Sequence, residues 1–229
     1  MTRRALALGQ NSFVDYGYNE AIKTLRTNIQ FCGSSVRTVM FTSAIPDEGK
    51  SELTFETARS LGQIGKTVLL IDADIRKSVL ASRCHIKQEV DGLSQYLSSQ
   101  KTLEEVIYDT DMEHVSVIFP GPYAPNPSEL LEEEKFEKLL GYARQYFDYI
   151  LIDTPPMANL IDGAIVARHC DGAIMVIESG AISYRLEQKV KRQLETSGCR
   201  ILGAVLNKVD EHTEIYYGKY GRYSRYGKS

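Results

Sequence analysis

The chain has 229 residues, of which 43% are hydrophobic, enough to bury one sizeable core and to predict a single domain. Its 27 basic and 30 acidic side chains give a net charge of −3, which does not support a nucleic-acid-binding protein. The cysteines form no CxxC pair, and no apolar run reaches the ~18 residues that a membrane-spanning helix needs. We expect a reduced, cytoplasmic protein that reaches a membrane only through a partner.

Short apolar, β-branched runs alternate with amphipathic stretches along the chain, as they do in βαβ units. Strands are expected at residues 36–42, 67–71, 115–119, 149–152, 173–177 and 201–206. Helices are expected at about 19–31, 50–64, 128–145, 164–168 and 185–196. One or two short helices are expected between residues 92 and 109. The near-continuous hydrophobicity of the strands is typical of strands covered on both faces. The pattern predicts an α/β fold with a doubly wound, mostly parallel sheet.

Two segments depart from this pattern. Residues 120–127 hold four prolines, which predict a stiff, irregular loop before a helix. Residues 216–229 hold five tyrosines and four basic side chains but no acidic or aliphatic one, whereas residues 1–215 hold 23 basic and 30 acidic side chains. We therefore predict a domain over 1–215 that begins with a helix at about 19–31, followed by a flexible tail over 216–229.

The segment AIPDEGKS at 44–51 follows a predicted strand and opens a predicted helix. It matches the phosphate-binding pattern GxxxxGK[ST], or Walker A, with Ala44 in place of the first glycine. In such a loop, backbone N–H groups near Gly49 surround phosphate oxygens, Lys50 places a charge on the β- and γ-phosphates, and the Ser51 hydroxyl binds Mg²⁺. The sequence predicts a P-loop nucleotide site. The residues assigned to it here are Pro46, Asp47, Glu48, Gly49, Lys50, Ser51 and Glu52.

Acidic residues end two further predicted strands. Asp72 and Asp74 follow the run VLLI and would share one face if the strand persisted. Asp153 ends the run ILI before a Pro-Pro turn, as in a Walker B segment. Open α/β sheets bind ligands at the carboxyl ends of their strands, and carboxylates brought close together there need a cation. We assign an Mg²⁺ site to Ser51, Asp72 and Asp153.

These three motifs and the tyrosine-rich C-terminus resemble the bacterial tyrosine kinases. The resemblance runs from about residue 19 to the end and includes PNPSELL at 125–131. It implies an ATP- and Mg²⁺-dependent P-loop kinase of the Min/Par-like fold that autophosphorylates its tail, between subunits, and regulates capsule or exopolysaccharide synthesis and export. The tyrosines that it assigns as phosphorylation sites are Tyr216, Tyr217, Tyr220, Tyr223 and Tyr226.

The same resemblance implies partners and a location. The chain resembles the cytoplasmic half of a two-chain system. That half is recruited to the inner face of the plasma membrane by a separate transmembrane activator, a polysaccharide co-polymerase. A homo-oligomer, such as a ring, and a tyrosine phosphatase are also implied. The family's Glu-x-x-Arg-x-x-Arg assembly signature reads Glu20, Lys23 and Arg26 here, and lysine cannot make arginine's planar two-point contact. We assign these three residues to oligomerisation, with a solvated helix face as the alternative.

For the reaction, the candidate catalytic residues are Lys50, Asp72, Asp74 and Asp153. A tyrosine hydroxyl, with a pKa of about 10, is a weak nucleophile at neutral pH, so a nearby carboxylate would assist it. The residues leave open whether Asp74 or Asp153 is this base, and whether Arg76 contacts phosphate or an acidic neighbour. Ser78 stands where the family often has proline, which we expect to loosen that turn.

The last predicted strand ends in the string NKVD at 207–210. Asn207 could contact the nucleotide base, and the string also matches the NKxD pattern with which many GTPases recognise guanine. The resemblance favours adenine, and a simple turn after the strand is the alternative.

Two other functions fit the same P-loop fold. One is a partition-type ATPase of the Min/Par group, and the other is a nucleotide-gated assembly factor without kinase activity. Partition ATPases carry a lysine directly after the first Walker A position, where this chain has Ile45. The missing lysine and the five tail tyrosines favour the kinase.

Overall fold

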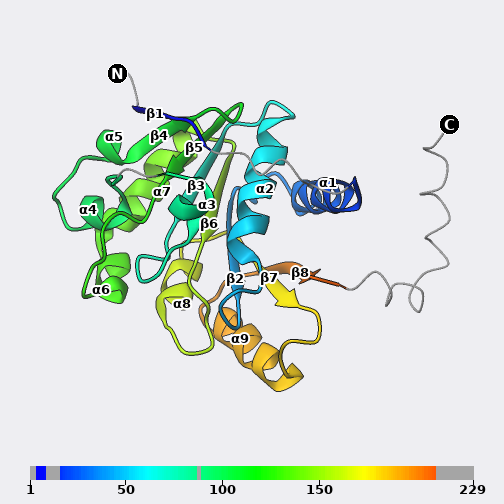
Figure 1. Cartoon of the computed structure of the whole chain (residues 1–229). Coiled ribbons are helices and arrows are strands. Elements are labelled where there is room, and N and C mark those ends of the chain that lie inside the picture. Colours follow the sequence, from blue (N-terminus) through cyan, green and yellow to red (C-terminus); the bar gives the residue numbers. More distant parts are fainter. Residues whose placement is uncertain (1–3, 9–15, 87–88, 210–229) are drawn as a thin grey trace, which may run out of the picture.

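The computed structural model describes residues 4–8, 16–86 and 89–209, so the predicted tail at 216–229 lies outside the described residues (Figure 1). The strands of the described part are β1 (Arg4–Leu6), β2 (Thr38–Ser43), β3 (Val68–Asp72), β4 (Ile107–Thr110), β5 (Val115–Ile118), β6 (Tyr149–Asp153), β7 (Gly172–Glu178) and β8 (Ile201–Asn207). Its helices are α1 (Tyr16–Phe31), α2 (Lys50–Gly62), α3 (Leu80–Arg83), α4 (Leu93–Leu97), α5 (Leu103–Val106), α6 (Pro127–Glu132), α7 (Glu134–Tyr146), α8 (Asp162–Ala167) and α9 (Tyr184–Thr196).

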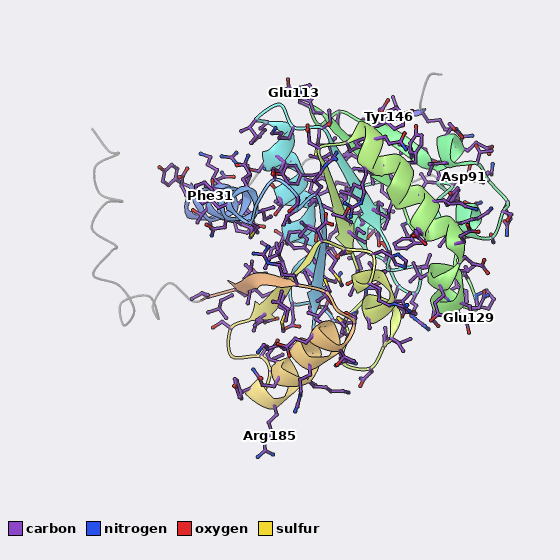
Figure 2. The ribbon with its side chains drawn as sticks, turned by 180° about the vertical axis from the view of Figure 1, so that it is seen from behind. Phe31, Asp91, Glu113, Glu129, Tyr146 and Arg185 are labelled. Carbon is purple, nitrogen blue, oxygen red and sulfur yellow. The ribbon has the colours of Figure 1, made fainter. Side chains whose placement is uncertain are left out.

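All the strands join one sheet in the order β1-β4-β5-β3-β6-β2-β7-β8. Every neighbouring pair is parallel except β4 with β5. Helices cover both faces, with α1 and α2 on one and α7 on the other, as the front and back views show (Figures 1 and 2). The predicted α/β fold with a doubly wound, mostly parallel sheet is confirmed.

Successive side chains of the central strands pack alternately into two hydrophobic cores, one on each face of the sheet. In β2, Val39 and Phe41 pack into the core under α1 and α2, whereas Met40 packs into the core under α6 to α9. This is the period of two that a strand imposes on its side chains. Because β2 and β3 are buried along their whole length, their ends are fixed on both sides. Such strands give the loops that follow them a rigid base.

Several predicted elements differ from the structure at their limits. The helix expected at 128–145 is two helices, because Glu133 has an extended backbone with ψ of 140°. Strands β1 and β4 were not predicted, since three or four residues carry too little pattern and pair only through the sheet. The last strand, β8, is an edge strand, and Leu206 is 58% exposed, so the prediction of cover on both faces is wrong for it.

The described helices include none that is both long enough and apolar enough to cross a membrane. The sheet instead determines where the polar residues meet. The central strands β2, β6 and β3 are parallel neighbours, so they end at the same edge. The P-loop candidate follows β2, and Asp72 and Asp153 end β3 and β6. Residues predicted separately from three motifs are therefore brought to one place.

Candidate active site

The loop between β2 and α2 has the geometry of a phosphate-binding loop. Gly49 ends the loop with φ of 88°, a left-handed conformation that side chains rarely adopt. A Cβ atom at this position would also lie 2.1 Å from Nδ2 of Asn207. Lys50 and Ser51 then begin α2, so that free N–H groups of its first turn face the loop. The predicted order of strand, loop and helix is confirmed.

Glu48 is an internal support of this loop. Its side chain is fully buried, and its carboxylate accepts hydrogen bonds from the N–H groups of Ala44 at 2.8 Å, Ile45 at 2.9 Å and Glu178 at 3.1 Å. These bonds join the start of the loop to its end and to β7. The Walker A pattern groups Glu48 with the phosphate-binding residues but carries no sign of this role, because all its partners depend on the folded loop.

The ammonium group of Lys50 lies between two oxygen-bearing side chains. It donates to Oδ1 of Asp153 at 2.5 Å and to the hydroxyl of Ser51 at 3.1 Å. Lys50 is 8% exposed and Asp153 is 2% exposed, so the ion pair is buried. The structure thus joins the end of β6 to the start of α2 through the two residues predicted as Walker B acid and Walker A lysine.

Asp72 is paired with Asp153 across adjacent strands and is fully buried. Its burial, together with the negative charge of Asp153, raises the pKa of Asp72 well above its usual value. Hydrogen bonds from the Ser78 hydroxyl and the Asp74 N–H partly offset this rise. Ser78 also accepts a bond of 3.0 Å from the N–H of Leu80, so its hydroxyl joins Asp72 to the start of α3, and the expected loosening of the turn stays a prediction.

Asp74 lies beside the P-loop but not on the strand. Strand β3 ends at Asp72, so the condition for a shared strand face, that the strand continues to Asp74, is not met. Oδ1 of Asp74 accepts the N–H groups of Arg76 at 3.3 Å and Lys77 at 3.0 Å. Its carboxylate borders a pocket of about 230 Å³ beside the P-loop. The lining residues include Ser43, Pro46, Asp47, Glu48, Gly49, Lys50, Ser51, Asp74, Arg76 and Lys77.

Arg76 contacts an acidic neighbour, one of the two partners, phosphate or an acidic side chain, that the sequence left open. Its Nε and Nη2 donate to the two oxygens of Asp162 at 2.7 and 3.0 Å. Asp162 begins α8 and is 1% exposed. Since Arg76 also lines the pocket, this two-point pair ties the site to the start of α8.

Asn207 and Lys208 tie the end of β8 to the P-loop. Nδ2 of Asn207 donates to the carbonyl oxygen of Glu48 at 2.9 Å. The Lys208 ammonium donates to the carbonyl oxygen of Asp47 at 2.6 Å and to Glu178 at 2.9 Å. The structure places Asn207 beside the loop, where the bond from its amide supports the loop backbone, and its contact with the nucleotide base stays a prediction. The string NKVD did not reveal this second role.

The remaining predicted residues lie away from the centre of the site. Glu52, in the first turn of α2, pairs with Arg83 at 3.0 Å. On α1, Lys23 and Glu20 form an exposed ion pair at 2.6 Å. Arg26 turns instead toward α2 and donates to the carbonyl and hydroxyl oxygens of Ser60 at 3.2 and 3.1 Å. The regular spacing of these three residues in the sequence could not distinguish the exposed ion pair from the arginine that contacts α2.

The donor atoms brought together here fit a small, hard cation. Ser51, Asp72 and Asp153 offer hydroxyl and carboxylate oxygens, the ligand type that Mg²⁺ prefers. Two buried carboxylates face one lysine, which leaves negative charge for a divalent ion to balance. The Lys50 and N–H groups beside them suit phosphate oxygens. The arrangement can therefore bind a metal-bound nucleotide phosphate.

Comparisons with known proteins agree with this geometry. A family model described as "AAA domain" matches residues 47–195. The chain is 40% identical over 208 residues to "Tyrosine-protein kinase CpsD" of Streptococcus agalactiae, covering 90% of this chain and 91% of that protein. It is 35% identical to "Tyrosine-protein kinase YwqD" of Bacillus subtilis, covering 96% and 92%. The kinase domain of Escherichia coli tyrosine kinase ETK superimposes with a TM-score of 0.78 at 31% identity, covering 84% and 78%.

Proposed function

The chain belongs to the family of bacterial tyrosine kinases, and we propose that it transfers the γ-phosphoryl group of ATP to tyrosines of its own C-terminal segment, between subunits. The observation that carries the proposal is the buried group of Lys50, Asp72 and Asp153 at the P-loop. The acceptors are Tyr216, Tyr217, Tyr220, Tyr223 and Tyr226. A partition-type ATPase shares the fold, but neither the relatives' names nor the tail sequence favours it.

The residues divide the work by position. The ammonium group of Lys50 moves from Asp153 to the γ-phosphate and neutralises charge there. The N–H groups of the loop around Gly49 hold the phosphates. Ser51, Asp72 and Asp153 would hold Mg²⁺, which supplies a positive charge to the phosphate oxygens. Burial of these groups excludes water and strengthens each charge interaction.

Of the two carboxylates considered as the base, Asp74 has the better position. It is half-buried, lines the pocket and is available to an incoming hydroxyl. Asp153 is buried and paired with Lys50 at 2.5 Å. We therefore assign Asp74 to orient the tyrosine hydroxyl and accept its proton.

The biological setting belongs to the same proposal. We propose a cytoplasmic kinase recruited to the inner face of the plasma membrane by a transmembrane activator, where it regulates capsule or exopolysaccharide synthesis and export. A tyrosine phosphatase would reverse its modification. Self-association would involve α1, where Glu20 and Lys23 present an exposed charged pair and Arg26 supports the helix on α2.

A mixing experiment tests the reaction. Wild-type protein should become reactive to an anti-phosphotyrosine antibody when it is incubated with ATP and Mg²⁺, and a Lys50→Met protein should not. The Lys50→Met chain is then mixed with an active chain whose five tail tyrosines are all phenylalanine. Phosphate on the Lys50→Met chain supports transfer between subunits. ATP hydrolysis by the wild type without phosphotyrosine would indicate the ATPase instead, and transfer only within single chains would contradict the intersubunit route.

A further inference from the structure

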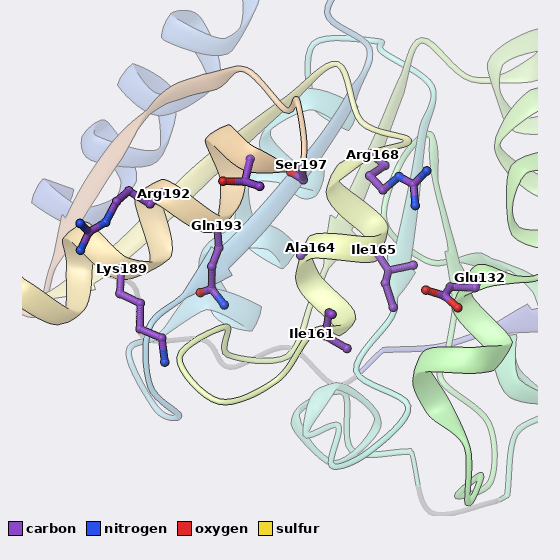
Figure 3. Close-up of a pocket in the computed structure, with 10 residues that line it drawn as sticks. Glu132, Ile161, Ala164, Ile165, Arg168, Lys189, Arg192, Gln193 and Ser197 are labelled. Carbon is purple, nitrogen blue, oxygen red and sulfur yellow. The ribbon is translucent and has the colours of Figure 1, made fainter.

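A second pocket lies outside the P-loop site, between α8, α9 and the end of α6 (Figure 3). Its volume is about 530 Å³. Ala164 and Ile165 of α8, with Ile161 directly before the helix, form an apolar wall. Basic side chains from both helices and one acidic side chain stand around that wall. These charged residues are Arg168, Lys189, Arg192 and Glu132. A pocket of this size accommodates an aromatic side chain with a charged group.

The basic groups around the pocket are not neutralised by neighbours. No ion pair within the described part of the chain includes Arg168, Lys189 or Arg192. The ammonium of Lys189 donates to the carbonyl oxygen of Ala158 at 2.6 Å, and Nε of Arg192 donates to that of Gln188 at 3.2 Å. Neither bond supplies a negative charge. The pocket is therefore positive overall, with three basic groups against one acidic group.

A polar group on the same wall is also unsatisfied. Gln193 lines the pocket, and its side-chain oxygen is buried without a hydrogen-bond partner among the described residues. In Figure 3 this side chain extends from α9 in the same direction as that of Lys189. Since the two ends of an amide are interchangeable by rotation, the group can offer N–H donors to a ligand. An anion with an apolar part would satisfy both the amide and the arginines.

We propose that this pocket binds a phosphotyrosine side chain of the C-terminal segment, from the same chain or from a second copy. The apolar wall takes the ring, and Arg168 at the end of α8 takes the phosphate, because one guanidinium group binds two phosphate oxygens at once. The inference rests on the proposed autophosphorylation for its ligand. It adds a place for the product, distinct from the place where the product forms.

Charge explains why the pocket would select the modified segment. Residues 216–229 carry four basic and no acidic side chains, so the unmodified segment is repelled by the positively charged pocket. Each phosphate adds about −1.5 to −2, so three phosphates reverse the sign of the segment's charge. Phosphorylation then turns repulsion by the pocket into attraction.

The two sites are adjacent, so the path from the P-loop site to this pocket is short. Leu160 lines the P-loop pocket, and the next residue, Ile161, lines the second pocket. Seven residues separate Val209 from Tyr216 and 17 separate it from Tyr226, giving extended reaches of roughly 23 and 56 Å. Helix α9 is roughly 20 Å long. The later tyrosines can therefore reach the pocket of their own chain or that of a neighbour.

Fluorescence anisotropy with a synthetic peptide tests the proposal. The peptide covers residues 216–229 with phosphate on Tyr220, Tyr223 and Tyr226, and the protein is the full chain with its own tail tyrosines changed to phenylalanine. We expect binding at least tenfold tighter than for the unmodified peptide or one with glutamate at the three positions. Arg168→Glu or Arg192→Glu should weaken binding about tenfold or more, and Glu132→Gln should tighten it.

Two matched variants distinguish binding in this pocket from a general effect of charge and from binding at the P-loop. Lys191→Glu changes the same charge on the same helix, but Lys191 pairs with Glu195 outside the pocket, so binding should change less than about threefold. Lys50→Met should bind the peptide as wild type does. Equal binding of the unmodified peptide, unchanged binding in Arg168→Glu, or loss in Lys50→Met would each overturn the proposal.

The peptide arrives already phosphorylated, so its binding does not depend on kinase activity. Peptide binding without autophosphorylation would contradict only the proposed function, and autophosphorylation without peptide binding would contradict only the pocket. A full chain phosphorylated on its tail identifies the source of the ligand. Exclusion of the peptide at a concentration where the chain is monomeric supports binding of its own tail. Exclusion that appears only as the chain associates supports the tail of a second copy.

Discussion

Carboxylates at the two ends of the central strands have opposite surroundings: those at the carboxyl edge are fully buried, and those at the amino edge are half-buried. At the carboxyl edge, Asp72 and Asp153 lie side by side with the ammonium of Lys50, and the pKa of Asp72 is raised by burial and by Asp153. At the amino edge, Asp171 accepts hydrogen bonds from the N–H groups of Arg37 at 2.8 Å and Thr38 at 2.7 Å. Residues of the same type therefore carry unbalanced charge at one edge and balanced charge at the other.

Arginine side chains complete the amino edge. Arg144 donates to the second oxygen of Asp171 at 2.9 Å, and burial of Asp171, which would raise its pKa, is outweighed by these bonds, so the pKa is lowered. Bonds from the backbone and hydroxyl of Thr67 likewise lower the pKa of Asp148. The difference teaches that burial of an acid does not by itself identify a site. The partners distinguish a structural carboxylate from one that is available for binding.

The largest expected effect is on activity at the carboxyl edge. Lys50→Met should lower the rate of autophosphorylation by 10²–10³, equivalent to roughly 3–4 kcal/mol of transition-state stabilisation. Asp72→Asn should also lower this rate strongly, yet the variant should melt no lower than wild type, because the change removes one of two repelling charges and keeps the Lys50–Asp153 pair. Phosphotyrosine blotting and thermal melts measure both. A strongly destabilised Asp72→Asn protein would show that this acid is structural.

The opposite result is expected at the amino edge. Asp171→Ala should lower the free energy of unfolding by about 2–3 kcal/mol, since two N–H groups and Arg144 lose their acceptor, while autophosphorylation of the folded protein persists. Because the folded-state pKa of Asp171 is lowered, its contribution is present above the unfolded pKa and is lost as pH falls through the folded one. Urea denaturation at pH 7 and pH 3.5 measures this. An equal loss at both pH values would contradict the charge argument.

Glu187 on α9 provides a smaller test of the same contrast. Its carboxylate oxygens are buried without a hydrogen-bond partner among the described residues, and burial, with the charge of Glu48, raises its pKa to about 7. The folded state favours protonated Glu187. The contribution of this protonation to stability is therefore full below the unfolded pKa of the group and is lost as pH rises toward 7.

Glu187→Gln should therefore stabilise the protein at pH 8 by about 1 kcal/mol, discounted for partial solvation, and have little effect at pH 5. Thermal melts at the two pH values give the comparison. A Gln variant that is less stable than wild type at pH 8 would indicate a bound cation or a bond that the carboxylate needs.

The smallest expected effects concern α1. Arg26→Ala should lower the free energy of unfolding by about 1 kcal/mol, because the bonds to Ser60 of α2 are lost. Glu20→Ala should change it by less than about 0.5 kcal/mol, since its ion pair with Lys23 is exposed. If α1 also mediates assembly, light scattering should show a lower mass for Glu20→Ala at unchanged stability. An unchanged mass would indicate that Glu20 and Lys23 form only a solvated helix face.

The sequence by itself determined the fold class and the P-loop, because both are encoded locally. Apolar runs and amphipathic stretches give their period within a dozen residues, and the loop pattern is contiguous from Ala44 to Ser51. The chain order of the motifs also predicted that Asp72 and Asp153 would reach one edge of the sheet.

Only the tertiary structure decided which of these residues are partners. Asp72 and Asp153 are 81 positions apart in the chain but are adjacent because β3 pairs with β6. Glu48 and Asn207 support the loop, and Arg26 binds α2, through contacts that no spacing encodes. A pattern gives the type and order of side chains. Their charge state and hydrogen bonds depend on neighbours that strand pairing and packing bring from distant parts of the chain.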